Sequence, residues 1–511
     1  MKSFTAILFI LIICMFAFHC ENTSDPIAIT YPLNGALFPP EIAPPEIRWT
    51  DSESTTQWKL VFNFENNIEP IAVMVDTLNW MPDSTVWEHI KKQSLEKTTT
   101  LTITRLIRRF GRNLEKGSQN ITFMTSKDSV AAPVFFRELP IPIRYAAAHM
   151  QDIKWRLGNV ASAKPPQTVL ETLPSCANCH SFSQDGRTIG MDVDVQGDKS
   201  AYLITAFDEK TCLNQNSIMH WNQYFKNDIH KTSGLFSRIS PDGHYVLSTV
   251  QERIFYLTGY DKAYSFLFFP VNGILAYLDR ETDQILALPG ADDPAFVQTS
   301  GVWSPDGETI VFARAKAYQS KEKKPYGVPI GFKEGAEILG GEKFLVPGQT
   351  GAKRFMYDLY KIPFNQGKGG TPVPVPGASG NNKSNYFPKI SPDGKWLVFT
   401  QARSYMLANK GSELYISSMK GGPPRRMQCS IGNMNSWHSW SPNSRWIVFS
   451  GKYFSPHTEL WLAHIDEEGN DSIPVLLSHF SAPGKAANIP EFVNISPEAV
   501  RHISVDGSMG M

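Results

Sequence analysis

The residues with the clearest potential for chemistry form the run Cys176-Ala-Asn-Cys179-His180, inside "LPSCANCHSFSQDGRTIGMDVD" (173–194). Two cysteines three positions apart, followed directly by a histidine, are typical of covalent haem attachment, in which the thiols add to the two vinyl groups of one porphyrin. The adjacent histidine is then placed to bind the iron on its proximal side. The motif therefore predicts one haem c, attached through Cys176 and Cys179, with His180 as an iron ligand.

Three other kinds of site use cysteines at this spacing: a disulfide, a thioredoxin-like redox pair and half of a zinc site. A zinc site needs further ligands, and the chain has no second C-x-x-C. A thioredoxin-like pair belongs in a βαβ context, which the flanking sequence lacks. Haem is the favoured interpretation.

The sequence leaves the sixth iron ligand open. Met191 is expected to pair across a hairpin with Cys179, beside the proximal ligand, which favours a packing role for it. Flanking segments offer other candidates, namely His149, Met150, Met219, His220 and His230. A six-coordinate iron would favour electron transfer, whereas a five-coordinate iron open to water would favour catalysis.

The N-terminus has the layout of a secretory signal. Lys2 precedes the apolar run "FTAILFILIICMFAF", which is shorter than a typical membrane span. Cys20 resembles the lipidated cysteine of bacterial lipoproteins, although Phe18 and His19 replace the usual small residues; ordinary cleavage near an incidental cysteine is the alternative. We expect a signal peptide over 1–19, a lipidated linker over 20–25, and an outer-membrane lipoprotein facing the periplasm or the cell surface.

Composition excludes several classes of function. In the 511 residues, 49 Lys and Arg balance 49 Asp and Glu, with no basic block to bind nucleic acid. No G-x-S-x-G, phosphate loop or H-E-x-x-H is present, so hydrolase and nucleotide-driven activities lack a site. In an oxidising compartment Cys212 and Cys429 could form a disulfide, if their geometry allows it.

The first part of the chain reads as a separate β domain. Residues 26–130 contain short β-rich runs such as "WKLVFNF" and "TTLTITRLI" between polar turns. This pattern favours a small β-sandwich of immunoglobulin or fibronectin type III kind. Residues 131–172 are interpreted as a connector, with one short helix around Ala146 to Trp155.

The rest of the chain repeats one unit. Its copies are "SRISPDGHYVLSTV" (237–250), "GVWSPDGETIVFAR" (301–314), "PKISPDGKWLVFTQ" (388–401) and "HSWSPNSRWIVFSG" (438–451). Ser accepts hydrogen bonds at the first turn position, Pro presets φ, Asp caps the turn and Gly supplies a positive φ. Because an apolar run follows each turn, we expect each copy to be the inner hairpin of a four-stranded propeller blade.

The haem motif aligns with these hairpins. Phe182 falls on Ile239, Trp303, Ile390 and Trp440, and His180 takes the position of His438. The motif should therefore lie where an inner strand enters the central channel. His438 becomes a further candidate for the distal ligand, because equivalent positions of different blades converge on the channel; a histidine bonded within its own blade is the alternative.

These repeats resemble the TolB-like β-propeller family over residues 173–500, with 501–511 as a tail. The resemblance implies an all-β propeller of six to eight blades, of which we expect six, and five hairpins are visible. The sixth could come from "RFMYDLYKIPF", from the segment before Cys176 or from "ANIPEFVNISPEAVRHISV", and this last segment could instead close the ring by adding a strand to the first blade.

Together these features predict an exported, lipid-anchored monohaem protein that performs electron transfer or a haem-dependent redox reaction. Its membrane contact would be the lipid at Cys20, and the sequence does not identify a redox partner. The alternative is an envelope scaffold that binds proteins on the propeller faces, with accessory or no haem.

Overall fold

A computed structural model describes residues 27–53, 55, 57–65, 68–173, 177–225, 231–258, 266–319, 326–327, 329–330, 354–407 and 410–506. The signal segment, Cys20, Cys176 and His230 lie outside the described residues. The chain divides into two compact units, one of Met1–Gly35 and Pro44–Met124 and one of Ala36–Ala43 and Thr125–Met511.

The N-terminal unit consists of two antiparallel sheets and one helix. One sheet has the order β1 (Ala28–Tyr31), β3 (Ile47–Thr50), β6 (Asn79–Trp80), and the other contains β8 (Arg112–Thr125), β7 (Thr99–Arg109), β4 (Trp58–Phe64) and β5 (Ile71–Val75) in that order. Alternate residues of β4 are buried, as expected for a strand with one face on a core. The sequence analysis did not anticipate helix α2 (Ser84–Gln93), whose N-terminus is capped by the Asp83 side chain.

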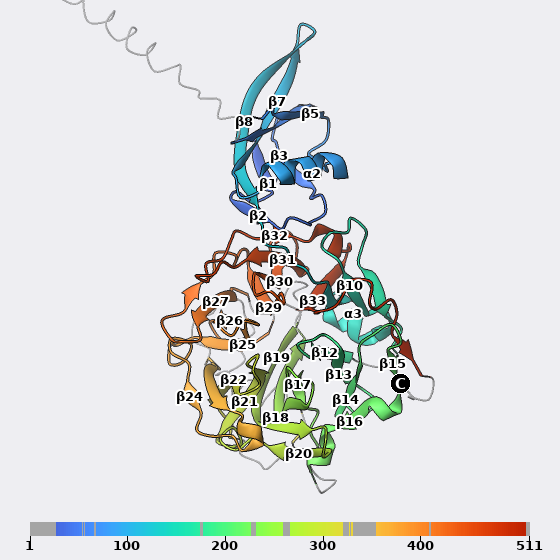
Figure 1. Ribbon diagram of the computed structural model, residues 1–511, viewed down its shortest axis with the longest axis vertical. Coiled ribbons are helices and arrows are strands. Elements are labelled where there is room, and N and C mark those ends of the chain that lie inside the picture. Colours follow the sequence, from blue (N-terminus) through green and yellow to red (C-terminus); the bar gives the residue numbers. More distant parts are fainter. Residues whose placement is uncertain are drawn as a thin grey trace, which may run out of the picture. The chain divides into compact units, whose positions relative to one another are not determined.

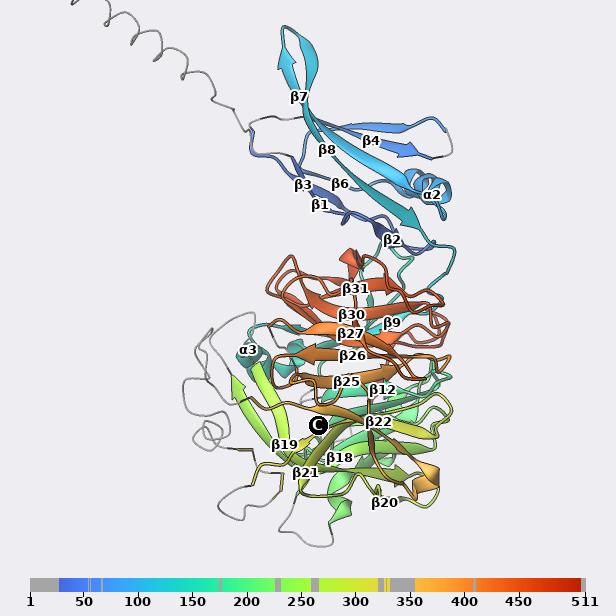
Figure 2. The same ribbon diagram turned by 90° about the vertical axis from the view of Figure 1, so that its left-hand side faces the viewer.

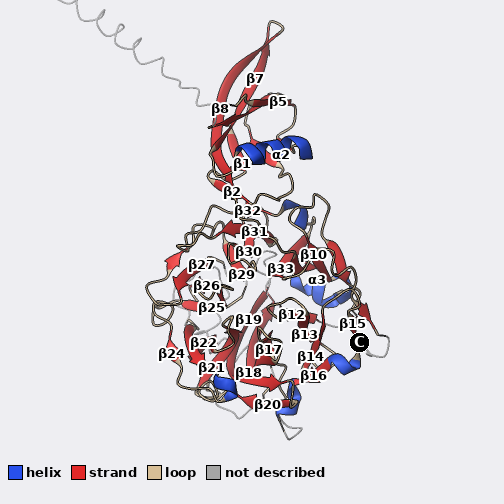
Figure 3. Cartoon of the chain, viewed as in Figure 1, coloured by secondary structure: helices blue, strands red, loops and turns tan. Residues whose placement is uncertain are grey.

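The second unit is a six-bladed β-propeller, which Figure 1 shows face-on and Figure 3 shows to be built almost entirely of strands. Each blade contains four antiparallel strands, of which the first named is the innermost and the last the outermost. A parallel pairing of Gly273 with Val297 joins blades 3 and 4 into one eight-stranded sheet. Blade 1 comprises β33 (Lys485–Phe492), β9 (Val134–Pro140), β10 (Lys154–Gly158) and β11 (Gln167–Leu170). Blade 2 comprises β12 (Ala177–Phe182), β13 (Thr188–Val193), β14 (Ala201–Ala206) and β16 (Ile218–His220).

The other four blades follow in chain order. Blade 3 comprises β17 (Leu235–Ile239), β18 (Tyr245–Thr258), β19 (Phe266–Asp279) and β20 (Gln284–Ala287). Blade 4 comprises β21 (Phe296–Trp303), β22 (Thr309–Lys316), β23 (Asp358–Pro363) and β24 (Val373–Pro374). Blade 5 comprises β25 (Ser384–Ile390), β26 (Trp396–Ala402), β27 (Glu413–Ser418) and β28 (Arg425–Arg426). Blade 6 comprises β29 (Met434–Trp440), β30 (Trp446–Lys452), β31 (Glu459–His464) and β32 (Val475–Leu476).

Smaller elements lie outside the blade sheets. They are β2 (Ala36–Phe38), β15 (Cys212–Leu213) paired with β34 (Ser504–Val505), and the short 3-10 turns at Gln215–Ser217, Trp221–Tyr224, Asn365–Gly367 and Ser478–Phe480. Strands β18 and β19 continue past their blade as a long hairpin (Figure 2).

The six-blade prediction is confirmed, and blade 1 shows how the ring closes. Its inner strand comes from the tail, and its three outer strands come from 131–172, which the sequence analysis took for a connector. Two of the proposed sources of the sixth blade therefore combine, while the third, "RFMYDLYKIPF", contains the third strand of blade 4. The helix expected around 146–155 occupies α3 (Ile143–Ala148) and a 3-10 turn at Met150–Asp152.

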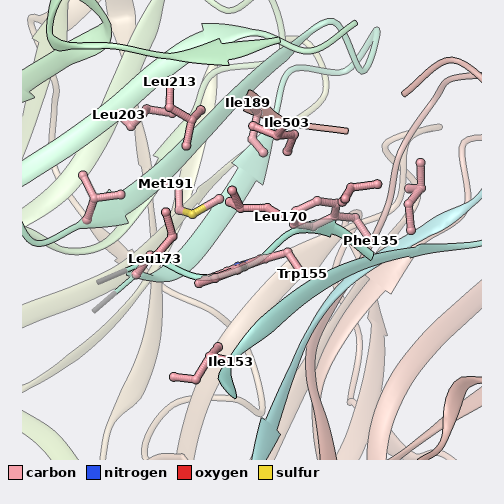
Figure 4. Packing of buried hydrophobic residues seen from close by; sticks show 14 of the residues in the cluster. Phe135, Ile153, Trp155, Leu170, Leu173, Ile189, Met191, Leu203, Leu213 and Ile503 are labelled. Carbon is pink, nitrogen blue, oxygen red and sulfur yellow. The ribbon is translucent and has the colours of Figure 1, made fainter. Parts of the chain in front are cut away.

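Trp155 is not helical, because it alternates with Leu157 in β10 and both side chains enter the core. That core joins blades 1 and 2 to the C-terminal segment, with Phe135, Met191 and Ile503 packed in one cluster (Figure 4). Cys212 and Cys429, whose pairing the sequence left open, are both free thiols.

The turns have the chemistry that the repeat predicts. In blade 3, the Ser240 hydroxyl donates to Asp242 at 2.5 Å and accepts from the backbone nitrogen of Tyr245 at 2.8 Å. Gly243 has φ 76°, in the left-handed region that glycine tolerates best. The same bonding recurs in the equivalent hairpins of blades 2, 4, 5 and 6, so the inner strands of blades 2 to 6 end in fixed positions around the channel.

Candidate ligand site in the propeller channel

Each inner strand carries a β-bulge at the same repeat position, and these positions form a ring around the channel. In five strands the residue there has a positive φ, namely Phe236, Ser300, Phe387, Trp437 and Ile489. In β12 the register shifts between Ala177 and His180, and the equivalent residue is Cys179. All six side chains line one cavity of about 30 Å³, hereafter the thiol-side cavity. A bulge redirects a side chain, which explains how six different residue types reach the same space.

Cys179 has a protonated thiol in this cavity. Burial, with the carboxyl of Asp192 close by, raises the pKa of Cys179 to about 12. Burial also raises the pKa of Asp192 to about 7, although the Ser237 hydroxyl and the Arg238 charge oppose this. Because the thiolate is the nucleophilic form, Cys179 is poorly suited to nucleophilic chemistry as it stands.

His180 lies away from that cavity, in the core between blades 1 and 2. Its ring is fully buried, 4.7 Å from the ring of Phe135 between centroids. Neither ring nitrogen makes a hydrogen bond of ordinary geometry, and burial lowers the pKa of His180 to about 3, so the ring is neutral. Its partner across the hairpin is Met191, which the sequence analysis had paired with Cys179; the bulge shifts the register.

His438 occupies the equivalent position in blade 6, as the alignment predicted. Its Nε2 lies 3.2 Å from the carbonyl oxygen of Val398, in β26 of the neighbouring blade. Burial lowers the pKa of His438 to about 3. His438 lines the thiol-side cavity whereas His180 does not, so the two rings do not face each other across the channel, and the His438 hydrogen bond is not within its own blade.

The other predicted iron ligands are dispersed. His149 stacks on Tyr145 at the end of α3, with ring centroids 4.0 Å apart, and Met150 follows it in a 3-10 turn. His220 pairs with Asp198 at 3.0 Å on the outermost strand of blade 2. Met191 alone is beside His180, within the core. Among the described residues, no group of three or more His, Cys, Asp or Glu side chains could hold a metal ion.

This arrangement does not fit a haem held by Cys179 and His180 together. Cofactor pockets measure about 300–1,000 Å³, far more than the thiol-side cavity. The two side chains also diverge from the strand, and Phe135 and Phe182 fill the space around the His180 ring. One feature points the other way, since neither ring nitrogen of His180 makes a hydrogen bond of ordinary geometry and the ring has only a weak polar interaction with the Ile489 backbone. The covalent haem stays a prediction.

A charged layer made of Arg238, Lys389 and Glu491 crosses the channel above the thiol-side cavity. Glu491 accepts from Arg238 at 2.6 Å and from Lys389 at 2.8 Å. Burial would raise the pKa of Glu491, but Lys389 and Arg238 lower it to about 2. Burial and the Arg238 charge lower the pKa of Lys389 to about 8. At neutral pH the layer therefore holds two cations and one anion.

A larger cavity of about 230 Å³ lies on the other side of this layer, hereafter the turn-side cavity. Its floor is the charged layer, and its wall combines the turn residues with six side chains at one repeat position: Phe182, Ile239, Trp303, Ile390, Trp440 and Phe492. The indoles of Trp303 and Trp440 each donate to a backbone carbonyl of the neighbouring inner strand, at 3.2 Å, which fixes their orientation.

Sequence reasoning missed this site, although it had aligned five of the six wall residues. The signal was the alignment column itself, because equivalent residues of a propeller's inner strands converge on the axis. The residue just before that column is Arg238 in blade 3, Lys389 in blade 5 and Glu491 in blade 1. An alignment of the residues just before the wall position would therefore have predicted three charged side chains at the same level of the channel.

No protein-family model matches the chain, and no curated protein matches it. Solved structures with similar folds include TolB from Acinetobacter baumannii, 12% identical with a TM-score of 0.41, covering 77% of this chain and 79% of that one. The periplasmic gluconolactonase PpgL of Pseudomonas aeruginosa is 14% identical with a TM-score of 0.34, covering 67% of this chain and 82% of its own. A putative 6-phosphogluconolactonase from Bacteroides uniformis is 13% identical with a TM-score of 0.32, covering 70% and 99% respectively. At these scores, the propeller assignment is based on this chain's own sheet topology.

Proposed function

We propose that the protein is an exported propeller of the bacterial cell envelope whose channel mouth binds a small molecule bearing a carboxylate. The observation that carries this proposal is the surplus of positive charge in the layer of Arg238, Lys389 and Glu491, at the floor of a cavity whose wall carries six apolar side chains. An anion that approached this floor would balance the layer and add charge-assisted hydrogen bonds. A binding role agrees with the scaffold alternative more closely than with catalysis.

The cavity sets the kind of ligand. An apolar cavity of about 150 Å³ holds benzene, so the turn-side cavity, at about 230 Å³, has room for a ring or a short hydrocarbon chain. Arg238 and Lys389 keep 18% and 20% of their side-chain surface exposed, which leaves donors for a ligand. The ligand would place its apolar part against Trp303 and Trp440 and its carboxylate on the floor.

The envelope location rests on the N-terminal signal and on Cys20, which would carry the lipid anchor. In the part of the chain that the structure describes, no helix is long and apolar enough to cross a bilayer. The anchor that we propose is the lipid at Cys20, in the outer membrane, with the propeller facing the periplasm or the cell surface.

Calorimetric titration with cinnamate, hexanoate and indole-3-acetate, each beside its uncharged amide, tests the ligand class. We expect the carboxylates to bind more tightly than the amides. Lys389→Met should weaken carboxylate binding by about 30-fold, the loss of one charge-assisted hydrogen bond of about 2 kcal/mol, and leave the amides unchanged. Lys395→Met, on the exposed turn of the same blade, is the matched control.

Equal affinity for acid and amide would contradict the proposal, as would failure of all the carboxylates to bind. Unchanged amide binding and thermal unfolding in Lys389→Met would show that the variant is folded, so that its loss of carboxylate binding reports on the charge.

A second candidate function, haem-dependent redox chemistry, is favoured by the cysteine spacing and by the buried His180 ring, whose nitrogens make no hydrogen bond of ordinary geometry. Its test is production with cytochrome c maturation enzymes, followed by denaturation and a search for haem that stays on the chain. We expect Cys176→Ala to reduce the attachment and Cys212→Ala to leave it unchanged. A chain without attached haem would remove this candidate and leave the ligand proposal intact.

A further inference from the structure

The hairpin of β7 and β8 in the N-terminal unit ends in an exposed, cationic tip. Its turn is Phe110-Gly111, with φ 50° and 78°, and the Phe110 side chain is fully exposed. Figure 1 shows this hairpin extending beyond the other strands of its unit. We define the hairpin tip as residues 107–114, which include Arg108, Arg109 and Arg112, all exposed. A large aromatic side chain with no packing partner at the end of a hairpin calls for a binding explanation.

Two of these arginines lie directly opposite each other. Arg109 pairs with Arg112 across the hairpin, and like charges in such a pair destabilise a sheet. Within the described residues, neither guanidinium has an acidic partner. Lower in the same strand, Arg105 is paired with both Asp51 and Glu53. Arg105, within the sheet, is therefore paired with carboxylates, whereas Arg109 and Arg112, at the tip, are paired with no described carboxylate.

The tip also carries apolar surface next to its charges. Ile107 pairs with Leu114, and Leu114 is about half exposed at 49%. Because side chains alternate along a strand, this pair lies on the same face as Arg109 and Arg112. An aromatic end, flanking arginines and an apolar pair behind them are the features of a segment that lies in a membrane interface.

We propose that the hairpin tip docks on an anionic phospholipid surface. Phe110 enters the boundary between headgroups and acyl chains, and Arg109 and Arg112 bind a lipid phosphate between them, which relieves their mutual repulsion. Arg108, on the other face, adds attraction to the negatively charged surface.

The position of the tip is compatible with the lipid anchor, a point that rests on the proposed lipidation of Cys20. Ile29, in β1, is hydrogen-bonded to the Gln119 side chain, eight residues along β8 from Gly111 and so about 27 Å from the tip. The nine residues from Cys20 to Ile29 can span about 31 Å when extended. The anchor and the tip can therefore contact the same membrane.

Vesicle sedimentation of the unacylated mature chain, from residue 21, tests this without the anchor, so a failure of lipidation does not affect it. We expect binding to phosphatidylglycerol vesicles at low salt and at least tenfold weaker binding to phosphatidylcholine. Arg109→Ser with Arg112→Ser should weaken binding to the anionic vesicles about 30-fold, because each basic residue contributes about fivefold. Phe110→Ser should weaken it roughly tenfold.

The double variant Arg187→Ser with Arg501→Ser removes two exposed arginines from the propeller and should bind like the parent. Inorganic phosphate at the same headgroup concentration should not displace the protein. The proposal is overturned by equal binding to both vesicle types, by tip variants that bind like the parent, or by full displacement with phosphate. Thermal unfolding matching the parent confirms that each variant is folded.

Discussion

The two cavities of the propeller channel differ in chemistry and in size. The thiol-side cavity holds Cys179 and has a volume of about 30 Å³, whereas the turn-side cavity has no cysteine and measures about 230 Å³. The charged layer of Arg238, Lys389 and Glu491 borders both. The cysteine of the C-x-x-C-H motif therefore lies at the smaller cavity. The larger cavity lies at a repeat position where the aligned residues are all apolar.

This difference shows that a short sequence motif does not by itself place its side chains in one site, whereas a cavity can be built from residues far apart in the chain. Cys179 and His180 are neighbours in sequence, but β12 sends their side chains to different environments. The wall of the turn-side cavity comes from six blades far apart in the chain, and ring closure brings them together.

The largest expected effect concerns the thiol. Because the pKa of Cys179 is about 12, against 9.0 for an ordinary thiol, its thiolate fraction at pH 8 is about 1,000-fold lower. Alkylation of Cys179 by iodoacetamide should slow by at least that factor relative to the unfolded chain, as measured by peptide mass spectrometry. Labelling of the native protein at the unfolded rate would mean that the thiol-side cavity is open to solvent.

A pair of tryptophan variants separates the two cavities. Trp440→Ala removes wall from the turn-side cavity and should weaken binding of cinnamate by about 30-fold, from the loss of about 2 kcal/mol of apolar contact. Trp437→Ala, three residues earlier, changes only the thiol-side cavity and should leave the affinity within twofold. Calorimetry on both variants gives the comparison, and equal losses would place the ligand elsewhere.

The ligand affinity should fall by about tenfold between pH 6.5 and pH 9. As pH rises through about 7, Asp192 ionises and adds negative charge near Arg238; as it rises through about 8, Lys389 loses its positive charge. Both changes weaken the attraction for a carboxylate.

The other groups around the layer keep their charge over this range. His180 and His438 have pKa values of about 3 and stay neutral, and Glu491, with a pKa of about 2, stays ionised. A flat profile for the acids, or the same fall for the amides, would contradict the role of Lys389.

The smallest effect distinguishes the two equivalent histidines. His438→Phe removes the hydrogen bond to Val398 and leaves a buried carbonyl without it, at an expected cost of about 1–2 kcal/mol in the free energy of unfolding. His180→Phe removes two ring nitrogens without a hydrogen bond of ordinary geometry, at the loss of a weak interaction with the Ile489 backbone, and should change that free energy by less than about 1 kcal/mol. Urea titration measures both, and a larger loss for His180→Phe would show that its ring has an unseen partner.

The propeller could be predicted because its signal is local and repeated. The four residues Ser-Pro-Asp-Gly are enough to predict a hairpin turn, and the recurrence of this motif along the chain indicates a repeated blade. Blade 1 was harder, because β33 and β9 are separated by more than 340 residues and neither carries the turn motif. Pairing at such distance depends on ring closure, for which a single sequence offers no local pattern.

The site was less predictable than the fold. The position of His438 relative to His180 followed from the alignment, but the direction of both rings depends on the bulge beside them. The bulge has no sequence signature, since its residue is Cys, Phe, Ser, Trp or Ile in different strands. For the same reason Met191 was assigned to the wrong partner across the hairpin.

Glu491 belongs to β33, close to the end of the chain, while the two cations that it neutralises come from blades 3 and 5. During synthesis, Arg238 and Lys389 therefore emerge long before their counter-ion. Two buried cations without an anion repel each other, which disfavours premature closure of an incomplete ring. The carboxylate thus links the electrostatic stability of the channel to completion of the ring, because the repulsion between the two cations is reduced only when the last strand has been added.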